Sequence, residues 1–480
     1  MTVNLNDELS ASDNMNSSNR RDLLKLMAMV PFLPSCIAVG RNDVMNMQMN
    51  KISLETPFGA MDVQAPNFDG MPLFNILDFG ADQANPAKTS VAIDQAIDAA
   101  SKSGGVVIVP AGVWETGKIH LKSNVNLHIA EGAELHFSSN PEDYLPAVHS
   151  TWEGLECYNY SPLIYAYECE NVAITGKGKL VAKLDIWKEW YARPQTHMDA
   201  LVELYYMAHK NVPVTERDMT KGAANLRPQF VQFNRCNNVL VEDISIVNSP
   251  FWVLHPYLCN NVTIRGAHIY AHGHNNDGAD PEMCTNVLIE NCIFDQGDDA
   301  ISVKSGREFD AWRLNAPCRN IVIRNCTVKN GHQLLAIGSE IAGGIENVYM
   351  HSCVVEPIVK QDIPTLMNLL FIKTNERRGG FVKNIFMDDI VADNLQGGVV
   401  SIDTDVLYQW RNLTPTLERR LTPIENIVVS NVQAKQASYV CNVNASAELP
   451  VRRLKLENVK VESVSGTALA TENVINFQLK

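Results

Sequence analysis

A short phrase built around asparagine recurs along most of the chain, and it constrains the fold more than any other feature. Each copy reads Asn, then Val or Ile, any residue, an aliphatic residue and two polar residues. After the second copy the copies lie roughly 23 to 42 residues apart, and they begin at Asn171, Asn238, Asn261, Asn286, Asn320, Asn347, Asn384 and Asn426. This spacing is too irregular for helical repeats but is typical of a solenoid whose coils carry loops of different length.

The residues around each copy indicate β-strands. Alternating β-branched runs such as Val287-Leu288-Ile289 fit short strands, and helical periodicity is nearly absent. Cysteines recur in two registers, at Cys169, Cys236, Cys259, Cys284 and Cys318 and again at Cys292 and Cys326. Equivalent positions stack in a solenoid, so we expect buried ladders of small side chains rather than a zinc or disulfide framework, with an occasional disulfide still open. The sequence therefore predicts an all-β fold, a single-stranded parallel β-helix.

The ends and interruptions of the repeats define the organisation of the domain. Residues 89–103 look helical and precede the first strand-like run, so we expect an N-terminal helix that covers the open end of the core. Residues 184–228, rich in Trp, Tyr, Met and His, interrupt the repeats and are expected to form a loop excursion over one face. We expect residues 51–480 to form a single β-helix domain.

The first 50 residues are expected to be an export signal and leader. The Arg20-Arg21 pair is followed by the apolar stretch 26–39, which resembles a twin-arginine signal, although a general secretory signal has similar features. The run 33–36 resembles a lipoprotein box in which Cys36 would carry the lipid; plain cleavage nearby is the alternative. We expect a protein that is exported, either to the periplasm or cell surface or into the medium.

The charge balance limits the class of partner. The chain has a formal net charge of -14 and 20% charged residues, whereas a nucleic-acid binder needs a basic face. Nucleic acid is therefore an unsuitable partner, and an anionic polymer would require a local cationic cleft.

Two consecutive coils align without a gap, residues 291–299 against residues 325–333. Asp298 and His332 then occupy the same register, and stacked positions lie about 4.8 Å apart, so both should face one groove. Asp277 lies roughly one coil earlier and can reach the same groove, where Asp299 also lies.

Three carboxyl groups in one site point to acid–base chemistry. Crowding and burial raise the pKa of at least one of them, which lets one carboxyl donate a proton while another activates water, as glycosidases require. Each motif alone is more often a solvated turn, and the shared register is what favours catalysis. Lys304 and Lys373 look like one strand position in different coils, with Arg378 just beyond, and they are expected to form the cationic cleft.

These motifs, in this order, resemble glycoside hydrolase family 28, the polygalacturonase family. Residues 275–277 resemble its Asn-Thr-Asp motif, residues 297–299 match Gly-Asp-Asp, residues 331–332 match the start of Gly-His-Gly, and Lys373 matches the end of Arg-Ile-Lys. The resemblance implies a right-handed β-helix that acts by single displacement with inversion, without metal or other cofactor.

The same resemblance implies a role for each site residue. Asp298 would be the general acid, Asp277 and Asp299 would activate water, and His332 would support the acid. Asn275 would position substrate and Lys373 would bind it. Acid and base should lie roughly 6.5–9.5 Å apart, so that water fits between them.

Three positions depart from the family pattern. Asn276 and Gln333 replace residues that take no part in proton transfer. Phe371 replaces the Arg of Arg-Ile-Lys and offers stacking against a sugar but no charge. The expected substrate is therefore an α-linked, galacturonate-containing pectic polymer or oligosaccharide, with rhamnogalacturonan and substituted galacturonan included. Closure of the groove by residues 184–228 would favour exo action.

Two other functions remain open at this point. A pectic polysaccharide lyase would use a cationic base and Ca²⁺ bound by the same aspartates. A non-catalytic glycan-binding β-helix would use the aspartates only as turns. We expect the protein to be a monomer.

Overall fold

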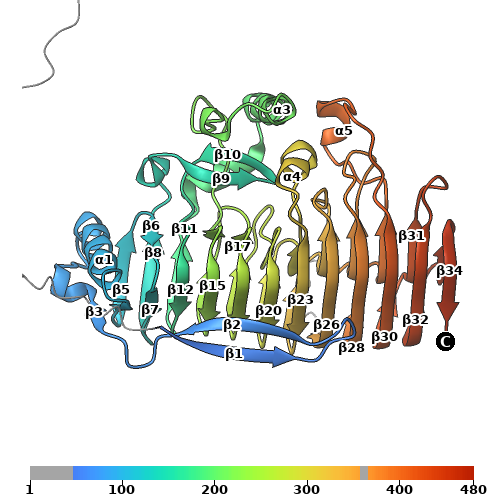
Figure 1. Cartoon of the computed structure of the whole chain (residues 1–480), viewed down its shortest axis with the longest axis horizontal. Coiled ribbons are helices and arrows are strands. Elements are labelled where there is room, and N and C mark those ends of the chain that lie inside the picture. Colours follow the sequence, from blue (N-terminus) through green and yellow to red (C-terminus); the bar gives the residue numbers. More distant parts are fainter. Residues whose placement is uncertain (1–46, 357–365) are drawn as a thin grey trace, which may run out of the picture. The chain divides into compact units, whose positions relative to one another are not determined.

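Short parallel strands follow one another in coils that stack along a single axis (Figure 1). The structure is a computed structural model that describes residues 47–356 and 366–480, within one unit, Asp43–Lys480. It is a right-handed, single-stranded parallel β-helix, which confirms the predicted fold class. The expected export signal and Cys36 lie outside the described residues. Among the helices described, none has the length and apolar character needed to cross a membrane.

The larger sheet contains 20 strands. They are β3 (Leu73–Asn75), β4 (Gly105–Val109), β5 (Gly112–Thr116), β7 (Val125–Ile129), β8 (Ala133–Phe137), β12 (Glu170–Thr175), β13 (Lys179–Ala182), β15 (Asn237–Glu242), β16 (Ser245–Val247), β18 (Asn260–Arg265), β19 (His268–Ala271), β20 (Thr285–Glu290), β21 (Ile293–Gln296), β23 (Cys318–Arg324), β24 (Thr327–Asn330), β26 (Ile345–Val355), β28 (Val382–Asn394), β30 (Ile424–Ala437), β32 (Val451–Val464) and β34 (Val474–Leu479).

A second series of short strands, here called the short-strand sheet, carries the candidate site. Its first part is β6 (Ile119–Leu121), β11 (Ile164–Tyr167), β14 (Val231–Asn234) and β17 (Leu254–Tyr257), and its second part is β22 (Ile301–Val303), β25 (Gln333–Gly338), β27 (Asn368–Lys373), β29 (Gly398–Asp403), β31 (Tyr439–Asn444) and β33 (Leu469–Thr471). Ala279 joins the two parts because it pairs in parallel with Leu254 on one side and Ile301 on the other.

The repeated asparagines form a ladder along the coils. Each side-chain amide donates to an asparagine one coil earlier; for example, Asn261 Nδ2 lies 3.1 Å from Asn238 Oδ1, and Asn347 Nδ2 lies 3.0 Å from Asn320 Oδ1. All the repeated asparagines have positive φ, near 54–60°, a conformation that asparagine tolerates better than most residues. The repeat is therefore a bend whose side chains bond between coils.

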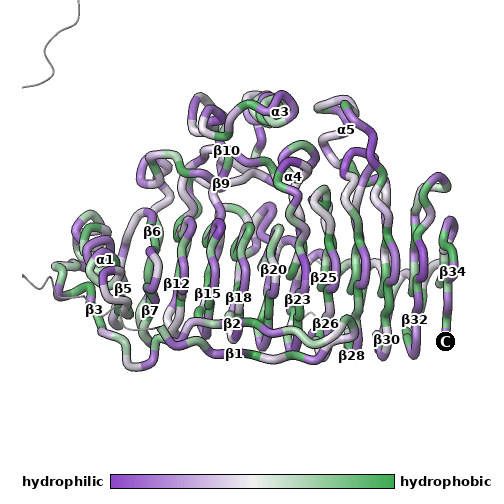
Figure 2. Tube along the Cα trace, in the orientation of Figure 1, coloured by the Kyte–Doolittle hydropathy of each residue, from purple (hydrophilic) through white to green (hydrophobic). Residues whose placement is uncertain are grey.

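The core between the sheets is apolar, and the cysteines belong to it. All ten cysteines in the described part of the chain are free and buried; Cys157 packs under helix α3 (Gln195–His209), and the other nine lie in the core of the coils, where Cys236 N and Cys259 Sγ of neighbouring coils are 3.4 Å apart. This confirms the predicted ladder. Along the strands hydrophobic and hydrophilic positions alternate (Figure 2), because every second side chain points inward.

One helix covers the N-terminal end of the core, as predicted. Helix α1 (Pro86–Ala100) begins three residues before the expected start, because Asn85 caps it through Lys88 N and proline suits the first helical position. Its buried face, which includes Ile93 and Ile97, packs on the core. Turn η1 (Ile76–Phe79) precedes it, and η2 (Pro141–Tyr144) follows later in the chain.

The expected loop excursion over residues 184–228 contains helices, which the sequence pattern did not predict. They are α2 (Asp185–Glu189), η3 (Trp190–Ala192), α3 (Gln195–His209) and η4 (Val214–Glu216). Helix α3 packs Leu201 and Leu204 against an unpredicted antiparallel hairpin, β9 (Val148–Trp152) and β10 (Leu155–Asn159). Figure 1 shows α3 and this hairpin along one edge of the coils, beside α4 (Glu308–Leu314) and α5 (Trp410–Leu413).

A second antiparallel hairpin, β1 (Gln48–Leu54) and β2 (Met61–Asn67), runs across several coils at the opposite edge (Figure 1). It packs Leu54, Met61 and Val63 against Leu288 and Val322 of the larger sheet. The excursion that carries α3 contacts the turn with Asn275, to which Arg193 donates a hydrogen bond at 3.0 Å.

Candidate active site

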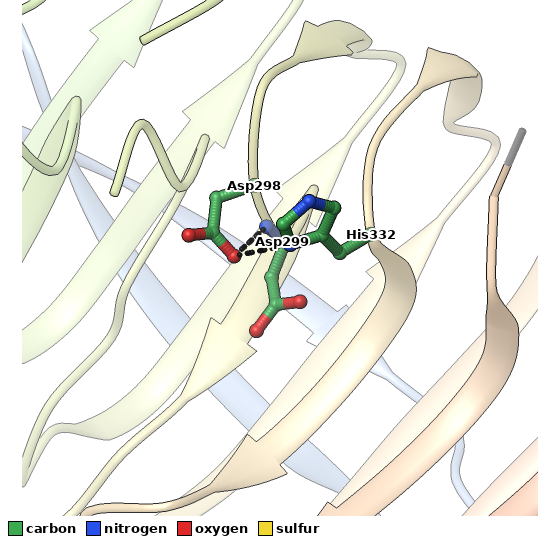
Figure 3. Close-up of side chains that lie close together, drawn as sticks. All are labelled: Asp298, Asp299 and His332. Atoms are coloured by element: carbon green, nitrogen blue, oxygen red, sulfur yellow. Dashed lines mark hydrogen bonds and ion pairs between the residues drawn. The ribbon is translucent and has the colours of Figure 1, made fainter. Parts of the chain in front are cut away.

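The register of the short-strand sheet pairs Asp298 with His332. Ile301 pairs with Leu335 in adjacent strands, and Asp298 and His332 each lie three residues before these partners. The predicted shared register is therefore present. His332 Nδ1 lies 3.0 Å from Asp298 Oδ1, and the two side chains face each other (Figure 3).

Asp277 and Asp299 occupy equivalent positions in neighbouring coils. Each lies two residues before the paired Ala279 and Ile301. One side-chain atom from each of Asp298, Asp299 and His332 lies within 4.8 Å of the others. The three aspartates predicted from the sequence therefore enter one face of the sheet at adjacent turns.

The aspartates differ in exposure. The side chain of Asp298 is 19% exposed and that of His332 is 43% exposed, whereas those of Asp277 and Asp299 are 5% and 1% exposed. The Asp298–His332 pair consequently meets solvent, and the other two carboxyl groups lie beneath it.

The cationic-cleft prediction required Lys304 to face a groove. In the structure Lys304 instead lies inside the cluster of carboxyl groups. Its Nζ is 3.3 Å from Asp277 Oδ2, 3.3 Å from Asp280 Oδ1 and 3.7 Å from Glu340 Oε2, and it donates to Ser302 Oγ at 2.8 Å. Its side chain is only 4% exposed. A buried ammonium group shared by three carboxyl groups offsets part of their negative charge and is not available to a substrate.

Burial raises the pKa of Asp277 to about 7, although Lys304 opposes the shift; the negative charges of Asp298 and Asp299 add to it. Burial also raises the pKa of Asp280 well above its ordinary value, again with a contribution from Asp277. Burial therefore disfavours the ionised form of Asp280, and a negative charge on Asp277 adds to this effect. The cluster holds a carboxyl group that can gain or lose a proton near neutrality.

The Asp298–His332 pair is ionic. Burial acts to raise the pKa of Asp298, but the hydrogen bond and charge of His332 outweigh it and lower the pKa. The same hydrogen bond raises the pKa of His332. One proton is thus held between Nδ1 and Oδ1, beside the solvent-facing carboxylate.

Lys373 binds the deeper carboxylate. Its Nζ lies 2.7 Å from Asp299 Oδ2, and Asp299 holds its pKa above the ordinary value although burial opposes this. The other oxygen, Asp299 Oδ1, is buried and accepts no hydrogen bond from the described residues. This oxygen is a ready acceptor for a water molecule.

The remaining predicted binding residues lie in different surroundings. Asn275 accepts hydrogen bonds at 3.0 Å from both Arg193 and Arg227 of the excursion. Phe371 is half-buried, with its ring centroid 5.8 Å from Lys373 Nζ. Arg378 is buried; it donates to Ser339 O at 2.6 Å and pairs with Glu308. Arg378 supports the framework behind the site, whereas Asn275 and Phe371 lie beside it.

The carboxyl groups of Asp298 and Asp299 are closer than the separation predicted from the sequence for an acid and a base. An oxygen of Asp298 and one of Asp299 lie within 4.8 Å, against the predicted roughly 6.5–9.5 Å between acid and base. The reason is that consecutive residues carry them at the turn into β22.

Asp298, Asp299 and His332 are also the described residues that could together hold a metal ion. Their atoms already engage each other and Lys373, and Lys304 contributes a second buried positive charge nearby. A hard divalent cation prefers several oxygen ligands without adjacent ammonium groups, so this donor set suits Ca²⁺ poorly.

Three residues of the site were not predicted. Asp280 lies three residues after Asp277, and a second carboxyl group so close in sequence was a usable signal. Glu340 lies behind Lys304 and pairs with Arg307 at 2.7 Å, which no local motif indicates. Tyr408 is 56% exposed, with φ 47°, and the charge of Lys373 acts on its phenol.

Known proteins have sequences and folds similar to those of this chain. A family model for glycosyl hydrolases family 28 matches residues 216–478. A solved hyperthermoactive exopolygalacturonase from Thermotoga maritima is 38% identical, with a TM-score of 0.77 over 87% of this chain and 94% of that one.

Two curated relatives are more distant. The exo-poly-alpha-D-galacturonosidase of Dickeya chrysanthemi is 24% identical over 83% of this chain and 69% of its own length. A Vitis vinifera protein named "Probable polygalacturonase" is 28% identical over 65% of this chain, and the match spans 59% of that relative's length.

Proposed function

This chain belongs to glycosyl hydrolases family 28, and from that premise we propose that it hydrolyses the α-linkage of a galacturonate-containing substrate. The observation that carries the proposal is the division of the carboxyl groups into two layers. Asp298 is paired with His332 at the solvent face, and Asp277 and Asp299 lie beneath, each bound to a lysine. Acid–base hydrolysis needs such unlike environments for otherwise identical groups.

In the proposed reaction Asp298 donates a proton to the leaving glycosidic oxygen. The proton held between Asp298 and His332 supplies the acid, and an approaching uronate carboxylate would favour the protonated form of Asp298 by like-charge repulsion. After the transfer Asp298 is a carboxylate beside a neutral imidazole, and a proton from solvent restores the shared proton. The role of His332 is to position and recharge the acid.

Asp277 and Asp299 activate the water. Asp299 Oδ1 has no partner among the described residues, while Lys373 fixes the other oxygen, so a water molecule can bind between Asp299 and Asp277. Lys304 keeps part of the Asp277 population ionised against the effect of burial. The water loses its proton to this pair as it attacks the anomeric carbon.

We propose inversion of configuration despite the short separation of the carboxyl groups. A carboxylate nucleophile must itself contact the anomeric carbon, and the 1% exposed side chain of Asp299 and the 5% exposed side chain of Asp277 leave little surface for a sugar. A water molecule needs far less room than a sugar ring. Proton NMR of the first product released should show the β-anomer, and initial formation of the α-anomer would instead indicate a covalent intermediate.

The substrate we propose is polygalacturonate or an oligosaccharide of it, cleaved from one end. The 38% identical Thermotoga maritima protein is an exopolygalacturonase, and helix α3 with hairpin β9–β10 lies along the edge of the coils beside the site. Such additions shorten a groove. Release of one product size from a long chain would support this mode, whereas a mixture of oligomers would contradict it.

Export is part of the proposal. The Arg20-Arg21 signal and the box ending at Cys36 are sequence features that suit a protein acting on a polymer outside the cytoplasm. Fractionation of cells expressing the full chain and its Cys36→Ser variant tests both. Membrane association that disappears in the variant would support a lipid anchor.

The experiment that tests the function is digestion of a panel of pectic polymers and oligosaccharides. Reducing ends and ultraviolet absorbance of unsaturated sugars are read from the same samples, with and without Ca²⁺. Reducing ends without absorbance are expected for a hydrolase. Absorbance dependent on Ca²⁺ would mean a lyase, and binding without turnover would mean a glycan-binding β-helix.

A further inference from the structure

Arg227 is a buried cation without an anion. It is 1% exposed, and its guanidinium donates to Pro250 O and His274 O, each at 2.7 Å, and to Asn275 Oδ1 at 3.0 Å. No carboxylate of the described residues lies within ion-pair distance, and Nε has no hydrogen-bond partner among them. Burial lowers its pKa to about 9. Within the described residues its positive charge therefore meets neutral acceptors and the aromatic rings of Trp152, Tyr191 and Phe251, with centroids 4.7–5.8 Å away, but no anion.

Other buried arginines near the site have carboxylate partners. Arg307 lies 2.7 Å from Glu340, and Arg217 lies 2.6 Å from Asp310. Removing a charge from water costs several kcal/mol unless a counter-charge compensates it. An unpaired buried guanidinium therefore suggests that its counter-charge comes from outside the protein.

A second arginine converges on the same acceptor. Arg193 Nη2 donates to Asn275 Oδ1 at 3.0 Å and contacts His274 Nε2, while its Nε is buried without a partner among the described residues. It too has no carboxylate within ion-pair distance in the described part of the chain. Burial, with the two arginines, lowers the pKa of His274 to about 4, so the imidazole is a neutral acceptor.

The two cations lie on the side of the aspartates away from Phe371. His274 and Asn275 belong to the turn that reaches Ala279, one coil before β22, whereas Phe371 belongs to β27, two coils after β22. One coil corresponds to about 4.8 Å, which is of the order of one sugar unit along a chain. The charge of Asp298 also acts on His274. A sugar beside the scissile bond can therefore reach this position.

We propose that Arg193 binds the carboxylate of the uronate next to the scissile bond on this side, with the buried charge of Arg227 behind it. This inference rests on the proposed function, and it makes Arg193 a specificity-determining residue for that function. Phe371 occupies the position where the family pattern has an arginine. In the proposal, Arg193 of the excursion binds the uronate carboxylate instead. Arg193 is half-buried and can exchange His274 for a carboxylate, whereas Arg227 holds Asn275 in place.

The test measures binding in the inactive Asp298→Asn background, using calorimetry with trigalacturonate and with its carboxyl-reduced, neutral counterpart. The added change Arg193→Gln should weaken trigalacturonate binding about 10- to 100-fold, the range for a hydrogen bond to a charged group, and leave the neutral sugar nearly unaffected. Arg193→Lys should restore part of the loss. Lys210→Gln, an exposed residue just after α3, is the matched control and should change neither affinity.

The outcomes separate the two proposals. Equal weakening for both sugars, or no weakening for either, would overturn the carboxylate subsite alone. Failure of the Asp298→Asn protein with Arg193 intact to bind any uronate oligosaccharide would overturn the proposed substrate and the subsite together.

Discussion

Replacing Lys304 by Met should move the acidic limb of activity to higher pH. Lys304 Nζ lies 3.3 Å from Asp277 Oδ2, and at an effective dielectric constant of about 20 two such charges attract by about 5 kcal/mol. Because Lys304 is shared among three carboxyl groups, this value is an upper bound. Opposite charges at such distances typically shift a pKa by about 1–3 units. Loss of the ammonium group should therefore raise the pKa of Asp277 from about 7 by a similar amount.

The change has a defined consequence for catalysis. If ionised Asp277 activates water, kcat/KM below its pKa falls about tenfold for each unit of the shift. At a pH near 6 the variant should therefore be about 10- to 1000-fold slower than the wild type, and the difference should shrink as the pH rises. The limb reports the coupled pair of Asp277 and Asp280 rather than one residue.

The Lys304→Met change should also lower the free energy of unfolding, and by an amount that depends on pH. A carboxyl group whose folded-state pKa lies above its unfolded value favours folding most below the unfolded pKa, and this contribution is lost as pH rises through the folded pKa. The Lys304→Met variant should therefore be destabilised by about 3–5 kcal/mol near neutrality and by less at acidic pH. Denaturant unfolding at two pH values measures this.

The assay for this prediction is the pH profile of kcat/KM on trigalacturonate, within the range in which circular dichroism shows both proteins folded. Lys383→Met is the control, since Lys383 pairs with Glu346 at 2.8 Å on the larger sheet and is 39% exposed. Its profile should match the wild type. A folded Lys304→Met enzyme whose acidic limb stays in place, or moves to lower pH, would refute the reasoning.

Three other changes test separate parts of the structure. His332→Gln removes the imidazole that shares the acid's proton with Asp298, and because the pKa of His332 is the raised one of the pair, the alkaline limb of kcat/KM should move to lower pH; an upward shift would contradict the shared proton. Lys373→Met should cost about 3–5 kcal/mol in denaturant unfolding, and adding Asp299→Asn should recover part of it, whereas simple additivity would argue against the buried pair. Asn261→Ala should cost about 2 kcal/mol, from one ladder bond and the positive φ, and Asn261→Gly about 1 kcal/mol; equal losses would show that φ does not matter.

The fold could be predicted because its determinants repeat. The asparagine phrase encodes a bend with positive φ and a bond to the previous coil, so eight copies specify the solenoid more firmly than any single element would. The same repetition allowed Asp298 to be aligned with His332. Where two consecutive coils align without insertions, residues at the same position in each coil lie side by side. Register is a local property that sequence carries directly.

Features that depend on packing between distant segments could not be predicted. Lys304 lies one residue beyond the strand Ile301–Val303, and only the tertiary structure brings Glu340 close enough to bury its ammonium group. The pairing of residues 148–152 with 155–159 lies outside the repeat. Arg227 reaches Asn275 across 48 positions of the chain, and no local pattern marks such a contact.

The most direct test of the account compares Asp298→Asn with Asp295→Asn in the hydrolysis of trigalacturonate. The two carboxylates are similarly exposed, 19% and 21%, and each contacts a histidine, at 3.0 Å and 2.6 Å. If Asp298 is the general acid, its replacement should lower kcat by about 10²–10⁴-fold while Asp295→Asn stays within a few-fold of the wild type. Equal activities for the two variants would contradict the assignment of catalysis to this cluster.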